Sequence, residues 1–273
     1  AKVEGILTVT QGDVVYTAQG YTAEYDGNGH SIAVNVTTPG GLVPKYALMP
    51  EGPYSATLPT FPHACTAVVV WYALEADQYA SVTNSATVTI ARRPLTAAMV
   101  NAIADQTYTG SEIKPPLTFT DAGNRMIAAE DYTATYSDNT VAGTASVKIT
   151  GKRNYAGEVT VTFKIVKANY DMSGAKWNYT TAFTYDKTEK SVSVTGLPAG
   201  VTVKAIADGR KTHAGDYVAK VSFNYDADNY NEPKLADCSW KINRKTLAVT
   251  ADAKTQTFGK AELPLTYKAP ALC

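Results

Sequence analysis

The 273-residue sequence is poor in cysteine and has no excess charge of either sign. Its three cysteines, Cys65, Cys238 and Cys273, are too few and too scattered for a disulfide framework, so we expect three independent thiols. The 25 basic residues balance the 25 acidic ones. Because a nucleic-acid-binding protein needs a basic patch, this balance gives no electrostatic case for a nucleic-acid partner.

Long hydrophobic runs are also missing. The longest apolar run, Ala67 to Leu74, has eight residues, whereas a membrane-spanning helix needs roughly 20. We therefore expect no membrane insertion within this segment. The chain begins at Ala1 with neither an initiator methionine nor a signal-peptide pattern, which indicates an excised or processed portion of a longer protein.

Enzyme motifs are absent from the sequence. It contains no G-x-S-x-G, H-E-x-x-H or G-x-x-x-x-G-K-[ST] motif, and we expect no catalytic residue and no cofactor. The group His63-Ala64-Cys65 has metal-ligand residue types, but a zinc site needs three or four convergent ligands. The acidic loop with Asp226, Asp228 and Asn229 has oxygens that suit Ca²⁺, yet it lacks the glycine and terminal glutamate of an EF-hand loop. We therefore expect a turn there rather than a metal site.

What the sequence does contain is a repeat of about 75 residues. Tyr79, Tyr155 and Tyr230 recur at intervals of 76 and 75 positions. The strand-like segments that follow end on isoleucines 90, 165 and 242, each followed by one or two basic residues. This periodicity is typical of tandem modules.

The beginnings and middles of the units match as well. Each unit opens with a tyrosine motif (Tyr25-Asp26-Gly27, Tyr108-Thr109-Gly110, Tyr185-Asp186-Lys187) and carries a central motif (His63-Ala64-Cys65, Val141-Ala142-Gly143, His213-Ala214-Gly215). The repeats are predicted at 1–93, with an extra N-terminal strand and the most divergent sequence, at 94–167 and at 168–243. Residues 244–273 resemble the truncated start of a fourth.

The secondary structure is predicted to be almost all strand. Val159, Val161, Phe163 and Ile165 alternate with polar residues, which is the period-two pattern of a half-buried strand. The 18 tyrosines, 19 glycines and 13 prolines are also typical of strands and turns. Strands at this spacing predict tandem small immunoglobulin-like β-sandwiches; β-grasp-like modules are the alternative, but they need a helix in each repeat. The only helix-like stretch, 95–104, predicts one turn at most.

The second repeat closely resembles tandem repeats of bacterial cell-surface proteins. The resemblance is carried by 103–110 (IADQTYTG), 131–139 (DYTATYSDN), 143–145 (GTA) and 151–157 (GKRNYAG). The restart at 245–254 (KTLAVTADAK), with Phe258-Gly259 and 263–267 (LPLTY), looks like the opening of MBG, or mucin-binding-like, surface repeats. This resemblance covers nearly all of the chain. It implies an extracellular protein attached to the cell wall or envelope, with stalk or adhesion roles and no catalytic residues.

The residue roles follow from the repeat. Tyr79, Tyr155 and Tyr230 are predicted to lock a turn, as in a tyrosine corner, and Ile90, Ile165 and Ile242 to complete each core. The less repetitive aromatics are candidates for surface recognition, because such rings bury large flat areas: Trp71, Tyr72, Trp177 and Tyr179.

These expectations give one leading function and one alternative. The leading interpretation is a non-enzymatic stalk or adhesin segment that acts as a semi-rigid spacer, contacts adjacent repeats of the same chain and binds a host glycan or extracellular protein. Short linkers without Ser/Gly-rich stretches favour modules that touch, and hence an elongated rod. The alternative is a set of accessory, non-catalytic modules of a large secreted carbohydrate-active or proteolytic enzyme.

Overall fold

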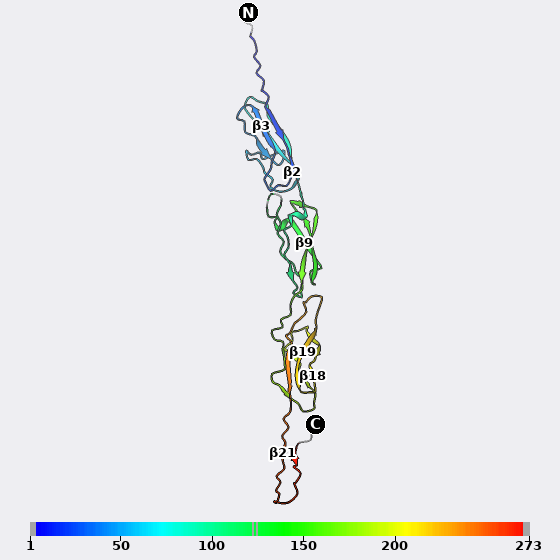
Figure 1. Ribbon diagram of the computed structural model, residues 1–273. Helices are drawn as coiled ribbons and strands as arrows, with labels where there is room; N and C mark the ends of the chain where they lie inside the picture. Colours follow the sequence, from blue (N-terminus) through cyan, green and yellow to red (C-terminus); the bar gives the residue numbers. More distant parts are fainter. Residues whose placement is uncertain (1–3, 122, 124, 270–273) are drawn as a thin grey trace. The chain divides into compact units, whose positions relative to one another are not determined.

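The computed structural model describes residues 4–121, 123 and 125–269 (Figure 1). Two compact units are present. The first comprises Ala1–Gln106, Glu112–Asn139 and Gly143–Lys164, and the second Thr107–Ser111, Thr140–Ala142 and Ile165–Cys273. The second unit therefore includes two short loops that come from the second repeat.

The first repeat forms two sheets that enclose a core. The larger has the order β2 (Tyr21–Glu24), β6 (Val82–Ala91), β5 (Cys65–Leu74), β4 (Lys45–Ala47), and the smaller pairs β1 (Val15–Gln19) with β3 (Ala33–Thr38). Alternate residues of β5 and β6 point inward, as period-two strands require, so that Val70, Tyr72 and Val88 are buried. Tyr16 of β1 and Val34 of β3 pack against them. This arrangement is a β-sandwich.

The second repeat has one four-stranded sheet covered by irregular chain. Its order is β8 (Gln106–Thr107), β12 (Glu158–Val166), β10 (Gly143–Gly151), β9 (Tyr132–Ser137). The covering segments contain two single 3₁₀ turns, η1 (Ala97–Met99) and η2 (Ala129–Asp131). They place Leu95, Met99 and Phe119 over Val147 and Ile149 of β10.

The third repeat lies in the second unit. Its main sheet has the order β14 (Phe183–Thr184), β20 (Cys238–Asn243), β19 (Gly215–Asn224), β17 (Thr202–Ala207). Two short pairs accompany it, β13 (Lys176–Trp177) with β16 (Val194–Thr195) and β15 (Lys190–Ser191) with β18 (Arg210–Lys211). Trp240 and Ile242 of β20 form its core with Val192. Beyond it, β21 (Thr250–Ala251) pairs with β22 (Tyr267–Lys268).

In each repeat, an early strand pairs with the last strand of the same repeat. In the first and third repeats this pairing is parallel, between β2 and β6 and between β14 and β20. In all three, the opening tyrosine donates its main-chain N–H to the residue after the core isoleucine: Tyr25 to Ala91 (2.8 Å), Tyr108 to Val166 (2.9 Å) and Tyr185 to Asn243 (2.9 Å). The three opening tyrosines therefore occupy equivalent positions.

The fold-class prediction is confirmed, because the chain is all-β with several small sheets. Within the described residues no α-helix forms, only the two 3₁₀ turns, so no β-grasp helix is present. The helix-like stretch 95–104 contains η1, the single turn that was predicted.

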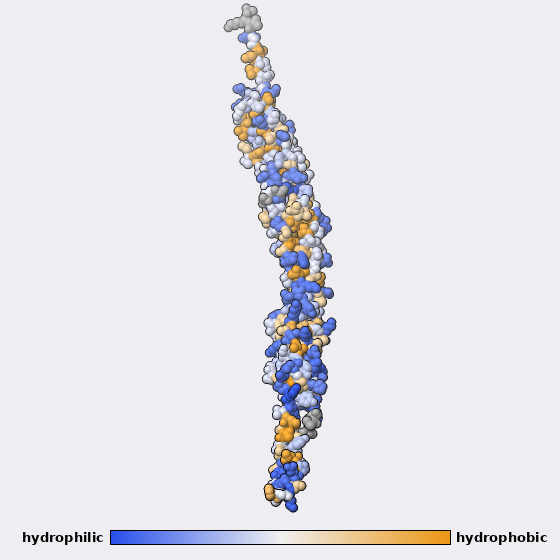
Figure 2. Space-filling view, viewed as in Figure 1, coloured by the Kyte–Doolittle hydropathy of each residue, from blue (hydrophilic) through white to orange (hydrophobic). Residues whose placement is uncertain are grey.

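Thiols and exposed apolar residues complete the description. Cys65 and Cys238 are free thiols, and Cys273 lies outside the described residues. In the described part of the chain, no helix is long and apolar enough to cross a membrane. The segment before β1 carries apolar side chains on its surface among polar ones (Figure 2); Ile6 is 93% and Leu7 87% exposed.

Candidate docking sites at the repeat tyrosines

Two of the repeat tyrosines end a tight turn and follow an asparagine. The Tyr155 N–H donates to the Lys152 carbonyl (2.9 Å), and the Tyr230 N–H donates to the Asp226 carbonyl (3.0 Å). Each bond closes its own turn through the main chain. The asparagine that precedes each tyrosine is thereby held at the tip, where its side chain can bind another part of the chain.

Asn154 joins the first and second repeats. Its Oδ1 accepts a hydrogen bond from the Ala64 N–H at 2.9 Å, across 90 positions of sequence. Its Nδ2 donates to Asp131 (3.2 Å) and lies 3.3 Å from His63 Nδ1. Both Asn154 (2% exposed) and Asp131 (6%) are buried. The Asp131 carboxylate therefore fixes the amide so that its oxygen faces Ala64.

Asn229 makes the same contact inside the second unit. Its Oδ1 accepts from the Ala142 N–H at 2.8 Å, and its Nδ2 donates to Asp226 Oδ2 at 2.9 Å. Asp226 Oδ1 also accepts the N–H groups of Asp228 and Asn229. A carboxylate again orients the amide, although here it comes from the same loop. These bonds hold the pKa of Asp226 below its ordinary value.

Two of the repeat tyrosines, Tyr155 and Tyr230, pack edge-on against an opening tyrosine. The Tyr25 and Tyr155 ring centroids are 5.6 Å apart at 75°, and those of Tyr108 and Tyr230 are 5.4 Å apart at 81°. Edge-to-face pairs of this kind contribute about 0.5–1.5 kcal/mol beyond area burial. The predicted tyrosine corner is wrong for Tyr155, since its hydroxyl donates to the Asp121 side chain (3.4 Å) rather than to upstream main chain.

The chain that follows Ile90 and the chain that follows Ile165 each pair with the next asparagine–tyrosine turn. The N–H groups of Arg93 and Ala168 donate to the carbonyls of Asn154 (2.8 Å) and Asn229 (3.0 Å). In the first case, β7 (Arg93–Pro94) runs parallel to β11 (Tyr155–Ala156). The basic residue just before adds side-chain bonds, since Arg92 donates to the Gly151 and Tyr155 carbonyls and Lys167 donates to Ala227.

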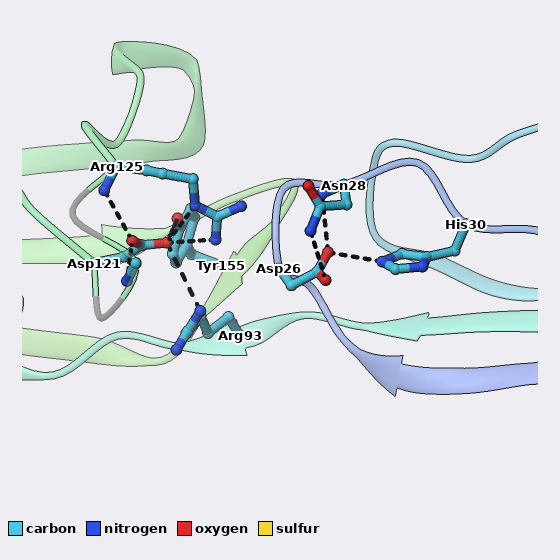
Figure 3. Close-up of polar contacts among 8 residues, drawn as sticks. Asp26, Asn28, His30, Arg93, Asp121, Arg125 and Tyr155 are labelled. Carbon is cyan, nitrogen blue, oxygen red and sulfur yellow. Dashed lines mark hydrogen bonds and ion pairs between the residues drawn. The ribbon is translucent and has the colours of Figure 1, made fainter.

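A buried carboxylate strengthens the Tyr155 site (Figure 3). The Asp121 side chain is fully shielded from solvent and accepts two hydrogen bonds from the Arg125 guanidinium, at 2.6 and 3.0 Å. Arg93 Nη1 lies 3.7 Å from the same carboxylate. The guanidinium also lies over the Tyr25 ring, 5.4 Å from its centroid, a favourable cation–π position. The cluster therefore ties the Tyr155 turn to Tyr25.

The environment of this cluster shifts the pKa values of its members. Burial raises the pKa of Asp121, but hydrogen bonds from Arg125 and Gly123 outweigh that effect, so its pKa lies below the ordinary value. The pKa of Arg125 is raised by its hydrogen bond to Asp121. Burial, together with the Asp121 charge, raises the pKa of Tyr155 to about 12. The cluster is therefore ionised at neutral pH, while Tyr155 is protonated.

A second polar group holds the loop that begins at Tyr25 (Figure 3). Asp26 Oδ1 lies 2.8 Å from His30 Nε2 and accepts the Asn28 N–H at 2.9 Å. The His30 ring stacks on Tyr21 with centroids 4.1 Å apart. The Asn28 N–H and His30 bonds hold the pKa of Asp26 well below its usual range.

The other predicted residues are distributed between core and surface. Ile90, Ile165 and Ile242 are buried, at 2%, 1% and 1% exposure. Tyr79 donates its N–H to Ala76 (3.2 Å), and its neighbouring main-chain groups bond to Gly12, so it also lies on a turn paired with incoming chain.

Three of the four recognition candidates, Tyr72, Tyr179 and Trp177, make internal contacts. Tyr72 is buried (2%) among the aliphatic core of the first repeat, so its surface assignment is wrong. Tyr179 is half-buried and accepts the Lys241 N–H with its hydroxyl (3.1 Å). Trp71 is half-buried in β5. Trp177 is half-buried, donates to the Ala236 carbonyl (2.8 Å) and packs on the third core.

Sequence reasoning missed several residues of these sites. The sequence predicts no role for Asn154 and only a turn for the loop that contains Asn229, although the recurrence of asparagine before tyrosine was a usable signal. Asp121, Arg125 and Asp131 carry no local signal, since charged residues of this kind are usually exposed. In the described part of the chain, no group of three or more His, Cys, Asp or Glu side chains could hold a metal ion.

Comparison with known proteins places the chain in no family. No family model matches the sequence, and no curated protein matches it. Among solved structures, the chain is similar to Sidekick-1 immunoglobulin domains 1–5 (11% identity, 85% of this chain and 58% of that one, TM-score 0.25). It is also similar to Drosophila OTK extracellular domains 3–5 (8%, 87% and 95%, TM-score 0.26). A third is a Bacteroides ovatus glucan-utilization protein, SGBP-B, in complex with a mixed-linkage heptasaccharide (9%, 88% and 71%, TM-score 0.20). The chain thus spans just over half the length of the first of these, and TM-scores this low carry no argument about function.

Proposed function

We propose that this chain is a non-enzymatic stalk or adhesin segment of a bacterial cell-surface protein, in which repeats dock directly on one another. The observation that carries the proposal is the Asn154 turn, whose buried amide bonds to main chain of the first repeat at 2.9 Å. The residues gathered there bind main chain and one another. Such an arrangement suits a rigid connection between neighbouring repeats.

Several features support a surface role. The repeats resemble bacterial cell-surface repeats over nearly all of the chain, and the balanced charge suits a module that is copied many times. A module whose neighbours attach by hydrogen bonds, an aromatic pair and an ion pair resists bending more than one on a flexible linker. The segment would act as a semi-rigid spacer in an extracellular setting.

Small-angle scattering of the full chain tests the spacer role. We expect a radius of gyration well above the roughly 18–19 Å of a single 273-residue globule. A value near that of the globule would contradict the proposal.

A glycan array and a panel of extracellular matrix proteins test the adhesin role. Specific binding that survives high salt would identify an adhesin. Silence across both panels would assign the chain a pure spacer role. The half-buried Trp71 and Trp177 are the first residues to substitute if binding is found.

A further inference from the structure

The third repeat carries the same set of groups that receives an asparagine–tyrosine turn in the first two repeats. The receiving set has three parts: an opening tyrosine, a main-chain N–H just before the longest central strand, and the chain after the core isoleucine. In the third repeat these parts are Tyr185, Ala214 and the pair Arg244-Lys245.

Hydrogen bonding shows that the parts are equivalent. Tyr185 donates its N–H to Asn243 just as Tyr25 donates to Ala91 (2.9 and 2.8 Å). Ala214 immediately precedes β19, as Ala64 precedes β5 and Ala142 precedes β10. Each of the three alanines therefore lies at the equivalent point of its own repeat, directly before a long central strand.

The chain after the isoleucine follows the same spacing. Arg244 lies two positions after Ile242, as Arg92 and Lys167 lie two after Ile90 and Ile165. Lys245 accordingly matches Arg93, whose N–H binds the Asn154 carbonyl.

In the third repeat these groups have no partner among the described residues. The Ala214 and Lys245 N–H groups make no hydrogen bond there, and the Arg244 guanidinium makes neither a hydrogen bond nor an ion pair. Arg244 and Lys245 are exposed. The Tyr185 ring is half-buried against the third core and has no aromatic partner in that part of the chain.

We propose that this face of the third repeat is a docking site for the asparagine–tyrosine turn of a further module of the same kind. The asparagine Oδ1 would accept the Ala214 N–H, the tyrosine ring would pack on Tyr185, and Arg244 would bind carbonyls of the turn. The inference depends on the proposed function in one respect: the partner is another repeat of a stalk made of such repeats.

The residues around the site favour an asparagine. His213 stands where His63 contacts the Asn154 amide, so the third repeat offers the same ring to an incoming side chain. The turn at Tyr79 carries Gln78 instead, a longer side chain in a positive-φ conformation (69°). We therefore assign the site to an asparagine turn and not to the first repeat of a second copy.

The test extends the chain with a module whose asparagine–tyrosine turn lies at the same distance from Lys245 as Asn154 and Tyr155 lie from Arg93. A chain is made in which residues 94–167 are copied directly after Lys245, so that the copied Asn154 and Tyr155 reach the third repeat as the originals reach the first. Amide hydrogen exchange at Ala214 is compared with the 273-residue chain. We expect exchange to slow by about tenfold or more, as expected for a newly formed, protected hydrogen bond.

Two variants make the result specific. Asn154→Ala in the copied segment alone should return Ala214 exchange to the rate of the 273-residue chain. In that unextended chain, Asn229→Ala should speed exchange at Ala142 and leave Ala214 unchanged.

Three outcomes would overturn the inference. These are unchanged Ala214 exchange in the extended chain, protection that survives Asn154→Ala in the copy, or concentration-dependent protection of Ala214 in the unextended chain, which would make a second copy the occupant. None of them bears on the scattering or binding tests of the stalk proposal, so the two can fail separately.

Discussion

Removing the Asp121 carboxylate tests the ionic cluster at the Tyr155 site. Asp121→Ala would leave the Arg125 guanidinium, whose side chain is 33% exposed, without its counter-charge. It would also orphan the N–H groups of Gly123 and Arg125, which the carboxylate accepts at 2.8 and 3.1 Å. Breaking one side of a buried pair typically costs about 3–5 kcal/mol. We expect the second repeat to lose stability on that scale.

A double-mutant cycle separates the pair from the rest of the site. Arg125→Met keeps a long side chain near Tyr25 but removes the charge, and Asp121 then retains its main-chain donors and Arg93 at 3.7 Å. Arg125→Met should lower the free energy of unfolding of the second repeat by about 2–3 kcal/mol. In the double variant neither charge is left without a partner. Its loss of unfolding free energy should therefore be about 2 kcal/mol smaller than the summed losses of Asp121→Ala and Arg125→Met.

The effect should depend on pH in a defined direction. The pKa of Asp121 is lower in the folded chain than the ordinary value near 3.9. Between these two pKa values the unfolded chain binds more protons than the folded one. The stabilisation is therefore fully present above about pH 4 and is lost as pH falls through the folded pKa. The difference in unfolding free energy between the unsubstituted chain and Asp121→Ala should therefore shrink as the pH falls below about 4.

Hydrogen exchange gives the assay its resolution. All three tryptophans, Trp71, Trp177 and Trp240, lie outside residues 94–167, so their fluorescence does not report directly on the second repeat. Exchange of peptides that cover β10 (Gly143–Gly151), followed through a urea series, measures that repeat. Trp71 fluorescence then shows whether the loss spreads to the first repeat.

A surface pair in the same repeat serves as the control. Glu158 and Lys148 are 2.7 Å apart but about half exposed, and Glu158→Ala should change stability little. The reasoning would be refuted if Asp121→Ala behaved like Glu158→Ala, or if its deficit were the same at pH 2 and pH 7.

Three further predictions concern the same unit. Asn154→Ala should lower the free energy of unfolding by about 2–3 kcal/mol and speed exchange of the Ala64 amide, which its side chain accepts. Asn139 is also buried, at 6% exposure, and Asn139→Ala should destabilise without that local effect; equal Ala64 exchange in the two variants would contradict the assigned contact. The pKa of Tyr155 is raised to about 12 in the folded chain. The free energy of unfolding should therefore fall by up to about 2–3 kcal/mol between pH 10 and 12. Tyr155→Phe should remove this pH dependence in urea titrations at alkaline pH. Gly27→Ala and Gly41→Ala both place a side chain at positive φ (81° and 82°), but only the Gly27 side chain would meet the Arg125 guanidinium. Gly27→Ala should therefore lower the melting temperature more than Gly41→Ala. Equal drops would argue against the Asp121–Arg125 cluster.

The sequence by itself determined the repeat, the strands and the core isoleucines. Alternation at 159–165 is sufficient for β12, because a strand with one buried face needs apolar residues at every second position. The recurrence of Ile90, Ile165 and Ile242 at one place in the period likewise predicts burial. These features are local or periodic, so they can be read from the sequence alone.

Tertiary structure decided which polar and aromatic side chains connect the repeats. Asn154 bonds to Ala64 across 90 positions, and Asp121 is buried only because Arg125, Arg93 and main-chain donors satisfy it. Tyr72 and Trp71 are adjacent in one strand, yet only Tyr72 is fully buried. A hydrogen bond depends on groups meeting within about 3 Å, and sequence spacing gives no such distance for residues far apart in the chain. The docking sites therefore emerged only once the strands had placed each asparagine turn beside the preceding repeat.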